Sequence, residues 1–117
     1  MSVSDQSALP LDAALEVRIL RSAGSAARVV VRGELDLANA PQLRELLPRA
    51  CAEADEVVLD LSGVHFIDSS GLCAILCALR ETQISGKRLT ISSALAPQAR
   101  RLFELAGVAG KLPLVDG

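Results

Sequence analysis

The chain has 117 residues, the length of one domain, and apolar residues make up 50% of it, so we expect a packed core rather than global disorder. Aromatic residues make up only 2% and the formal net charge is −2, which argues against base stacking on single strands and against a strongly basic nucleic-acid or membrane surface. No apolar run approaches the ~20 residues of a membrane span, and no signal peptide is recognisable, so the expected location is cytoplasmic.

The first part of the chain predicts a polar leader and then a hairpin. Residues 1–13 are small and polar, and we expect a flexible leader there, followed by one folded domain over residues 14–117. Apolar and charged residues alternate over 15–19, as in a half-buried strand. A turn around Gly24 leads into a valine-rich second strand over 28–32.

Helical periodicity marks three later segments. The first helix begins near Pro41, because proline suits the first turn of a helix. The second follows Asp68 and ends near Gly86, and the third runs from Pro97 to Gly107, since glycine favours a helix end. The buried stripes of the first and third helices are expected to consist of Leu43, Leu46, Leu47 and Ala50, and of Ala99, Leu102, Phe103 and Ala106.

Three more strands are expected, over 55–61, 88–92 and 112–115. The nearly continuous apolar run over 57–61 is typical of a central strand that is covered on both faces, and residues 62–68 are expected to connect it to the second helix. Strands separated by helices pair in parallel, whereas the opening hairpin is antiparallel. The predicted fold class is therefore α/β, a single domain with a mixed sheet of four to five strands flanked by three to four helices.

The segment Asp68-Ser69-Ser70-Gly71 joins the central strand to the second helix. Aspartate and serine are preferred helix caps, and capping alone would explain them. The same geometry holds Ser69 rigidly at the edge of the sheet where ligands and partners gather. A phosphate there adds roughly −1.5 to −2 charges, which the N-terminus of a helix tolerates. We therefore interpret Ser69 as a phosphorylation switch on a protein-docking surface.

Three blocks of the sequence resemble the STAS domain family, in particular the stand-alone anti-sigma factor antagonists of bacteria. The blocks are GELD at 33–36, FIDSSGL at 66–72 and RLFELAGV at 101–108, and the middle block is the most specific. The family often has glycine where Cys73 stands, and we expect this difference to affect packing more than recognition.

The resemblance implies a regulatory protein that is not an enzyme and needs no cofactor. In such antagonists the serine directly after the motif aspartate, here Ser69, is phosphorylated by an anti-sigma factor that is itself a serine kinase. The unphosphorylated form binds the anti-sigma factor and frees the sigma factor, and a serine phosphatase restores it, so transcription is regulated without direct contact to nucleic acid. The expected partner-binding residues are Asp36, Asp68, Ser69, Ser70, Gly71 and Leu72. Gly71, which has no side chain, is expected to let a partner approach closely.

Two alternatives keep this fold. The first is a scaffold subunit without a phosphate cycle, in a signalling assembly or on the ATPase of a lipid or solute transporter. The second is a severed regulatory domain of an anion transporter, which the short flanks and absent membrane spans disfavour. An adjacent gene for a histidine-kinase-like ATPase favours the antagonist, and transporter genes favour the scaffold.

The cysteines raise the alternative of a metal site. Cys73 and Cys77 share a helix face, and His65 lies nearby in the sequence. A structural zinc site normally needs four ligands, and these supply three. We therefore expect no metal, and we interpret all three cysteines, Cys51 included, as buried thiols.

The sequence gives less support to a catalytic or nucleotide-binding function. A hydrolase would have to pair His65 with Ser69 or Ser70, and the Gly-x-Ser-x-Gly elbow is absent. Neither a dinucleotide fingerprint nor a Walker loop occurs, so any ATP would belong to the partner kinase. The basic pairs at 87–88 and 100–101 are interpreted as solvated, with contact to an acidic partner as the alternative.

Overall fold

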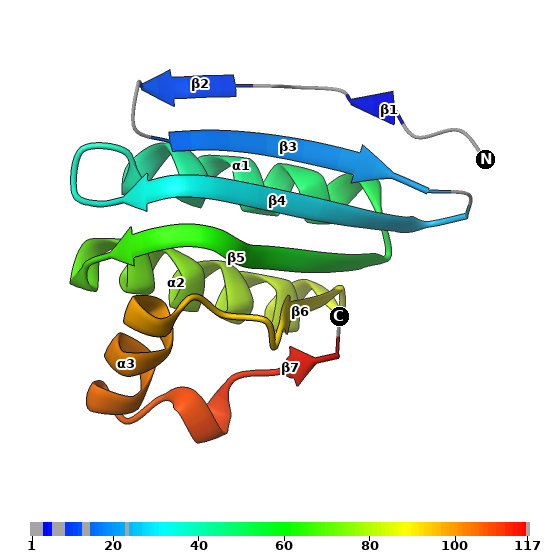
Figure 1. Cartoon of the computed structure of the whole chain (residues 1–117). Coiled ribbons are helices and arrows are strands. Elements are labelled where there is room, and N and C mark those ends of the chain that lie inside the picture. Colours follow the sequence, from blue (N-terminus) through cyan, green and yellow to red (C-terminus); the bar gives the residue numbers. More distant parts are fainter. Residues whose placement is uncertain (1–3, 6–8, 13–14, 23, 117) are drawn as a thin grey trace.

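The computed structural model describes residues 4–5, 9–12, 15–22 and 24–116, which form a mixed sheet, three α-helices and one 3-10 helix (Figure 1). The elements in chain order are β1 (Ser4–Asp5), β2 (Leu9–Asp12), β3 (Leu15–Arg21), β4 (Ala26–Leu35), α1 (Ala40–Glu53), β5 (Glu56–Ile67), α2 (Ser69–Ser85), β6 (Arg88–Ser92), α3 (Pro97–Leu105), η1 (Ala109–Lys111) and β7 (Leu114–Val115).

The sheet has the strand order β1-β3-β4-β5-β6-β7, and β2 also pairs with β3. The hairpin of β3 and β4 is antiparallel, and β5, β6 and β7 each add in parallel. Gly24 in the hairpin turn has a φ of 84°, a left-handed conformation that glycine adopts readily. The predicted α/β class and mixed sheet are confirmed, and all five predicted strands are present.

Two strands, β1 and β2, and the extension of β5 beyond residue 61 were not predicted. β1 and β2 lie within residues 1–13, and both pair with β3. The described residues therefore form seven strands rather than four to five. The predicted connection over 62–68 is wrong, because β5 continues as far as Ile67. The flexibility of the leader and the domain boundary at residue 14 stay predictions.

Irregular pairing with β4 explains why the end of β5 escaped prediction. The register shifts twice, so that the twelve residues of β5 pair along the ten residues of β4. Each shift is a β-bulge, which inserts one extra residue and turns the following side chains. The buried residues of β5 are accordingly spaced by two and then by three: Val57, Leu59, Leu61, Val64 and Ile67. The sequence of β5 therefore lacks the strict alternation of apolar and polar residues that would have predicted a strand as far as Ile67.

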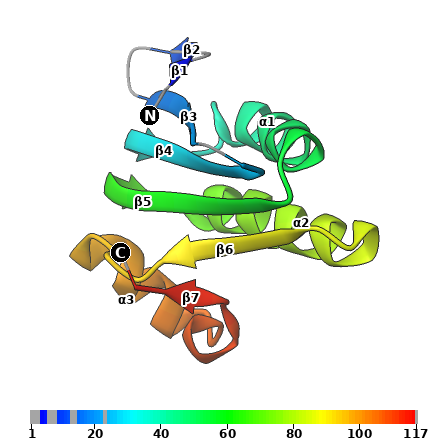
Figure 2. The ribbon, with the colours of Figure 1, turned by 90° about the vertical axis from the view of Figure 1, so that its right-hand side faces the viewer.

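The helices form two groups around the sheet. α1 and α2 pack together on one face, and α3 lies beside β5 on the side away from them (Figure 2). All four residues predicted for the stripe of α1 are buried. In α3 the prediction holds for Ala99 and Phe103, whereas Leu102 is half-buried and Ala106 is exposed at the helix end. Among the described residues, no helix combines the length and the hydropathy of a membrane span.

The connections place two helix starts at one edge of the sheet. β4 and β5 are parallel, and each leads into a helix that returns along the same face. The carboxyl ends of both strands and the N-termini of α1 and α2 therefore meet at the left edge in Figure 1. In open α/β sheets, this edge is where ligands and partners bind.

Candidate functional site

A groove of about 530 Å³ runs between the first turns of α1 and α2 at this edge. Its wall is mostly apolar, while Arg44 and Glu45 supply opposite charges from α1. Leu37, in the loop before α1, is 72% exposed although it is a large apolar residue. The lining residues are Leu37, Ala40, Pro41, Arg44, Glu45, Ser69, Ser70, Cys73 and Ala74. An exposed apolar surface rimmed by polar groups is typical of a docking site.

Ser69 is the first residue of α2 and is exposed to solvent at the groove. Ser70 follows it, lines the same groove and is half-buried. Because the N-terminal turn of a helix presents unpaired N–H groups and the positive end of the helix dipole, this position is compatible with an added phosphate. The side chain of Ser69 is accessible from solvent without opening the core.

Asp68 fixes the start of α2. Its Oδ1 accepts a hydrogen bond from the backbone N–H of Gly71 at 3.0 Å, which makes Asp68 the N-cap of the helix. Its Oδ2 accepts another from the backbone N–H of Leu37 at 3.2 Å. One carboxylate therefore ties the first turn of α2 to the loop before α1, on both sides of the groove.

The loop between β4 and α1 is ordered by side chains of its own. Asp36 is half-buried, and its Oδ1 accepts the backbone N–H of Ala38 at 3.0 Å. Asn39 is fully buried; its Oδ1 accepts the N–H of Asp36 at 2.9 Å, and its Nδ2 donates to the carbonyl of Glu34 at 2.9 Å. These bonds hold the loop in the shape that carries Leu37 into the groove wall.

The next two residues of the motif lie inside the molecule. Gly71 is buried, and a Cβ at this position would meet Leu35 at 2.7 Å and Ile67 at 2.8 Å. The expected reason for Gly71, close approach of a partner, is therefore replaced by close packing of α2 on the ends of β4 and β5. Leu72 is also part of the core. The structure thus brings Asp36, Asp68, Ser69 and Ser70 to the surface of one edge, and it places the other two predicted residues beneath it.

Three comparisons with known proteins converge on one family. The family model described as Mlab, STAS domain, matches residues 19–116. The anti-sigma-B factor antagonist of Staphylococcus aureus (strain NCTC 8325) is 30% identical over 90 residues, which cover 76% of this chain and 82% of that protein. An anti-sigma factor antagonist from Mycobacterium paratuberculosis has the same fold with a TM-score of 0.74, at 25% identity, over 95% of this chain and 92% of that structure.

The chain belongs to the STAS family of anti-sigma factor antagonists. SpoIIAA, an anti-sigma factor antagonist solved in its unphosphorylated form, shares the fold with a TM-score of 0.70 at 20% identity, over 86% of this chain and 87% of that one. The predicted family is therefore confirmed. The role of the individual site residues in partner binding stays a prediction.

The cysteines of this STAS domain differ from the prediction. Cys51 is buried, but Cys77 is half-buried and Cys73 is exposed in the groove. The expectation of three buried thiols is therefore wrong for Cys73, because its helix position faces α1 across the groove instead of the sheet. Across the described ranges, no group of three or more metal-ligating side chains gathers at one place.

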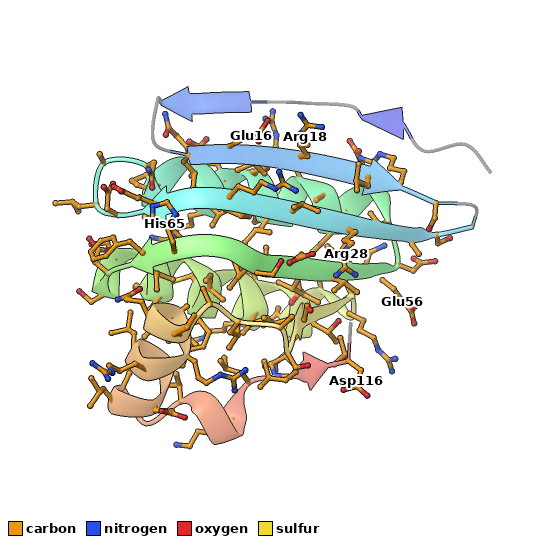
Figure 3. The ribbon with its side chains drawn as sticks, viewed as in Figure 1. Glu16, Arg18, Arg28, Glu56, His65 and Asp116 are labelled. Carbon is orange, nitrogen blue, oxygen red and sulfur yellow. The ribbon has the colours of Figure 1, made fainter. Side chains whose placement is uncertain are left out.

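His65 lies apart from the serines. Its Nε2 is 3.4 Å from Oε2 of Glu34, and both side chains are exposed on the open face of the sheet (Figure 3). Within the described ranges, its hydrogen-bond partner is thus a carboxylate on β4 rather than Ser69 or Ser70. This arrangement does not form the serine–histidine pair that a hydrolase would need.

Several residues at the site or next to it were not predicted from the sequence, among them Leu37, Asn39, Arg44 and Gln98. Leu37 and Asn39 follow the GELD block, and an apolar residue in a polar loop was the available signal for Leu37. Arg44 occupies the exposed face of a helix, where charged residues are common. The side chain of Gln98 accepts a hydrogen bond from the backbone N–H of Ile67, 31 residues away in the chain, and no local sequence pattern predicts such a contact.

Proposed function

We propose that this STAS domain binds an anti-sigma factor with serine kinase activity while Ser69 is unphosphorylated, and that a phosphate on Ser69 releases it. A serine phosphatase resets the switch. The sigma factor is freed while the antagonist occupies its inhibitor, so the chain regulates transcription indirectly in the bacterial cytoplasm. It performs no catalysis itself.

The observation that carries this proposal is the position of Ser69. It is exposed, it begins α2 directly after the capping Asp68, and it lines the groove. The hydroxyl is therefore accessible to an enzyme and at the same time adjacent to the apolar surface that a partner would cover. Further support comes from SpoIIAA, a protein of the same fold that has been solved in unphosphorylated and phosphorylated forms.

The electrostatics of the groove give a reason for release. A phosphoserine carries roughly −1.5 to −2 charges, and its oxygens hold water strongly. A partner that covers Leu37 and Pro41 would have to remove that water from the edge of an apolar contact, at a cost of several kcal/mol. Asp68 adds a second negative charge beside the phosphate. The helix start tolerates the dianion, so the domain stays folded while the partner leaves.

The second candidate is a scaffold subunit with a permanent partner and no phosphate cycle. The apolar lip formed by the exposed Leu37 suits such a contact equally well. The two functions differ in whether Ser69 ever carries phosphate. They are separated by the same experiment.

The test begins with capture of the partner by the tagged chain from its native host. The purified partner is then incubated with ATP and with wild-type, Ser69→Ala or Ser70→Ala protein, and intact mass reports phosphate. We expect one phosphate on wild-type and Ser70→Ala protein and none on Ser69→Ala, which stays bound. Ser69→Asp should bind at least about tenfold more weakly. Phosphate on the Ser69→Ala variant would overturn the assignment, and a bound partner that never phosphorylates the wild-type chain would favour the scaffold.

A further inference from the structure

The side chain of Gln98 pairs with the backbone of Ile67 as a neighbouring strand would. The N–H of Ile67 donates to Oε1 of Gln98 at 2.7 Å, and Nε2 of Gln98 donates to the carbonyl of Ile67 at 3.0 Å. Gln98 lies in the first turn of α3, directly after Pro97, and is half-buried. Both groups of its amide are used, and both bonds go to one residue of β5.

The sheet itself explains why Ile67 needs this partner. β6 pairs with β5 only from Glu56 to Leu59, and no other strand of the described residues lies along the rest of that edge of β5. Ile67 is 1% exposed, which leaves its backbone groups little access to water. A buried backbone group without a hydrogen-bond partner destabilises the folded state. The carboxamide of Gln98 has the same donor and acceptor as a peptide unit and closes the edge at this residue.

This contact also fixes the peptide unit next to Ser69. The Ile67–Asp68 peptide is planar, so its carbonyl and its N–H turn together. The carbonyl is held by Gln98 from α3, and the N–H of Asp68 donates to the carbonyl of Leu35 in β4 at 3.2 Å. The peptide unit is therefore hydrogen-bonded on both sides. Asp68 then caps α2, whose first residue is Ser69.

We propose that Gln98 is a positioning residue for the switch: it holds the Ile67–Asp68 peptide so that Ser69 presents its hydroxyl to the kinase in one orientation. This inference rests on the proposed function. Gln98 does not line the groove, so it acts on the phosphate transfer through the backbone and not through contact with the partner. Small misplacements of a reacting group reduce the rate of a transfer far more than they reduce docking.

The test uses Gln98→Glu and Gln98→Ala, with Gln83→Glu as the matched control. Gln98→Glu keeps the size of the side chain and the acceptor for the Ile67 N–H, but it places a carboxylate oxygen against the Ile67 carbonyl. Gln83 is exposed in the last turns of α2. Amide hydrogen exchange is measured at Ile67, Asp68 and the core residue Leu59, and phosphorylation by the captured partner is measured as kcat and KM separately.

Both Gln98 variants should exchange the Ile67 amide at least about tenfold faster, with Leu59 unchanged. Their kcat for phosphate uptake should fall about tenfold while KM stays within about twofold, and Gln83→Glu should match the wild type in both measurements. The inference is overturned if Ile67 keeps its protection in Gln98→Ala, or if kcat is unchanged once that protection is lost. A rise in KM at constant kcat would also overturn it.

Failure of the proposed function would look different. In that case the wild-type chain itself takes up no phosphate from its partner, whatever the exchange rates. Faster exchange at Ile67 in the variants would then leave Gln98 as a clamp on the backbone of β5, and its role in phosphate transfer would be refuted.

Discussion

The carboxylate of Asp68 accepts a hydrogen bond from the backbone N–H of Leu37, 31 residues earlier in the chain, at 3.2 Å. Its second oxygen caps α2 by accepting the N–H of Gly71. The two sides of the groove are thus connected through a single side chain.

Asp68→Ala should therefore destabilise the domain by about 1–2 kcal/mol, the usual effect of losing an N-cap. Asp68→Asn should cost less, because its amide oxygen still accepts one N–H. Chemical unfolding followed by circular dichroism measures both, with Asp116→Ala at an exposed C-terminal position as the control. An Asp68→Ala variant as stable as the control would show that the cap contributes nothing.

Gly71→Ala should destabilise the domain by about 1–3 kcal/mol, because the added methyl group would overlap Leu35 and Ile67. Gly110→Ala is a matched control, since a Cβ there has no atom within 4 Å and the residue is exposed. Thermal unfolding of the two variants gives the comparison. Equal stability would mean that α2 moves away from the strands at no cost.

Leu37→Ser should weaken capture of the partner by about 1–3 kcal/mol, which corresponds to the loss of an apolar contact near the centre of an interface. Because Leu37 is 72% exposed in the free protein, unfolding should change little. Ile84→Ser is the control, because Ile84 is 78% exposed near the other end of α2. Binding is measured by titration calorimetry with the purified partner. Similar losses for both substitutions would contradict a specific role of the groove.

The stability of the fold should depend on pH through the carboxyl group of Asp60. Burial acts to raise its pKa, but hydrogen bonds from Ser62 and from Arg28 outweigh it, so the pKa of Asp60 lies below its ordinary value. A carboxylate with a lowered pKa stabilises the fold above the pKa of the unfolded chain, about 3.9, and loses that contribution as pH falls through the folded pKa.

Asp60→Asn should therefore be less stable than wild type by on the order of 1 kcal/mol at pH 5–7, and the difference should shrink as pH falls below about 4. Urea unfolding at a series of pH values measures it, with Asp116→Asn as the control. A difference that grows in acid would mean that the sign of this argument is wrong.

The three thiols should react with iodoacetamide in a fixed order. Cys73 is exposed and should be alkylated first, whereas Cys51 should be last, because burial raises the pKa of its thiol and limits access. Peptide mass spectrometry over time gives the order. Because Cys73 lines the groove, its alkylation should also reduce partner capture, whereas brief treatment should leave partner capture by a Cys73→Ser variant unchanged.

The order of elements could be predicted because their signals are local. Pro41 and Gly86 mark a helix start and a helix end, and the stripe of α1 follows helical periodicity without interruption. The position of Ser69 at the start of α2 followed in the same way from the cap Asp68. The STAS resemblance added the family, which the comparisons confirm.

The remaining features depend on contacts between distant segments. Gly71 was read as an opening for a partner, but the atoms that fill it belong to Leu35 and Ile67 on two strands. Cys73 was interpreted as a buried thiol, but it lines the groove between α1 and α2 and is exposed. The clamp formed by Gln98 requires α3 to lie against the end of β5, which no periodicity in the sequence encodes.

The two bulges of β5 give this strand two residues more than its pairing with β4 requires. Loss of Ser62 or Gly63 would remove the first bulge, and Leu61 and Val64 would then be two positions apart, both still facing the core. Loss of one residue from the regular stretch between Val57 and Leu61 would instead put the following positions out of phase, and apolar side chains would turn to water. The strand is therefore more tolerant of a change in length after Leu61 than before it.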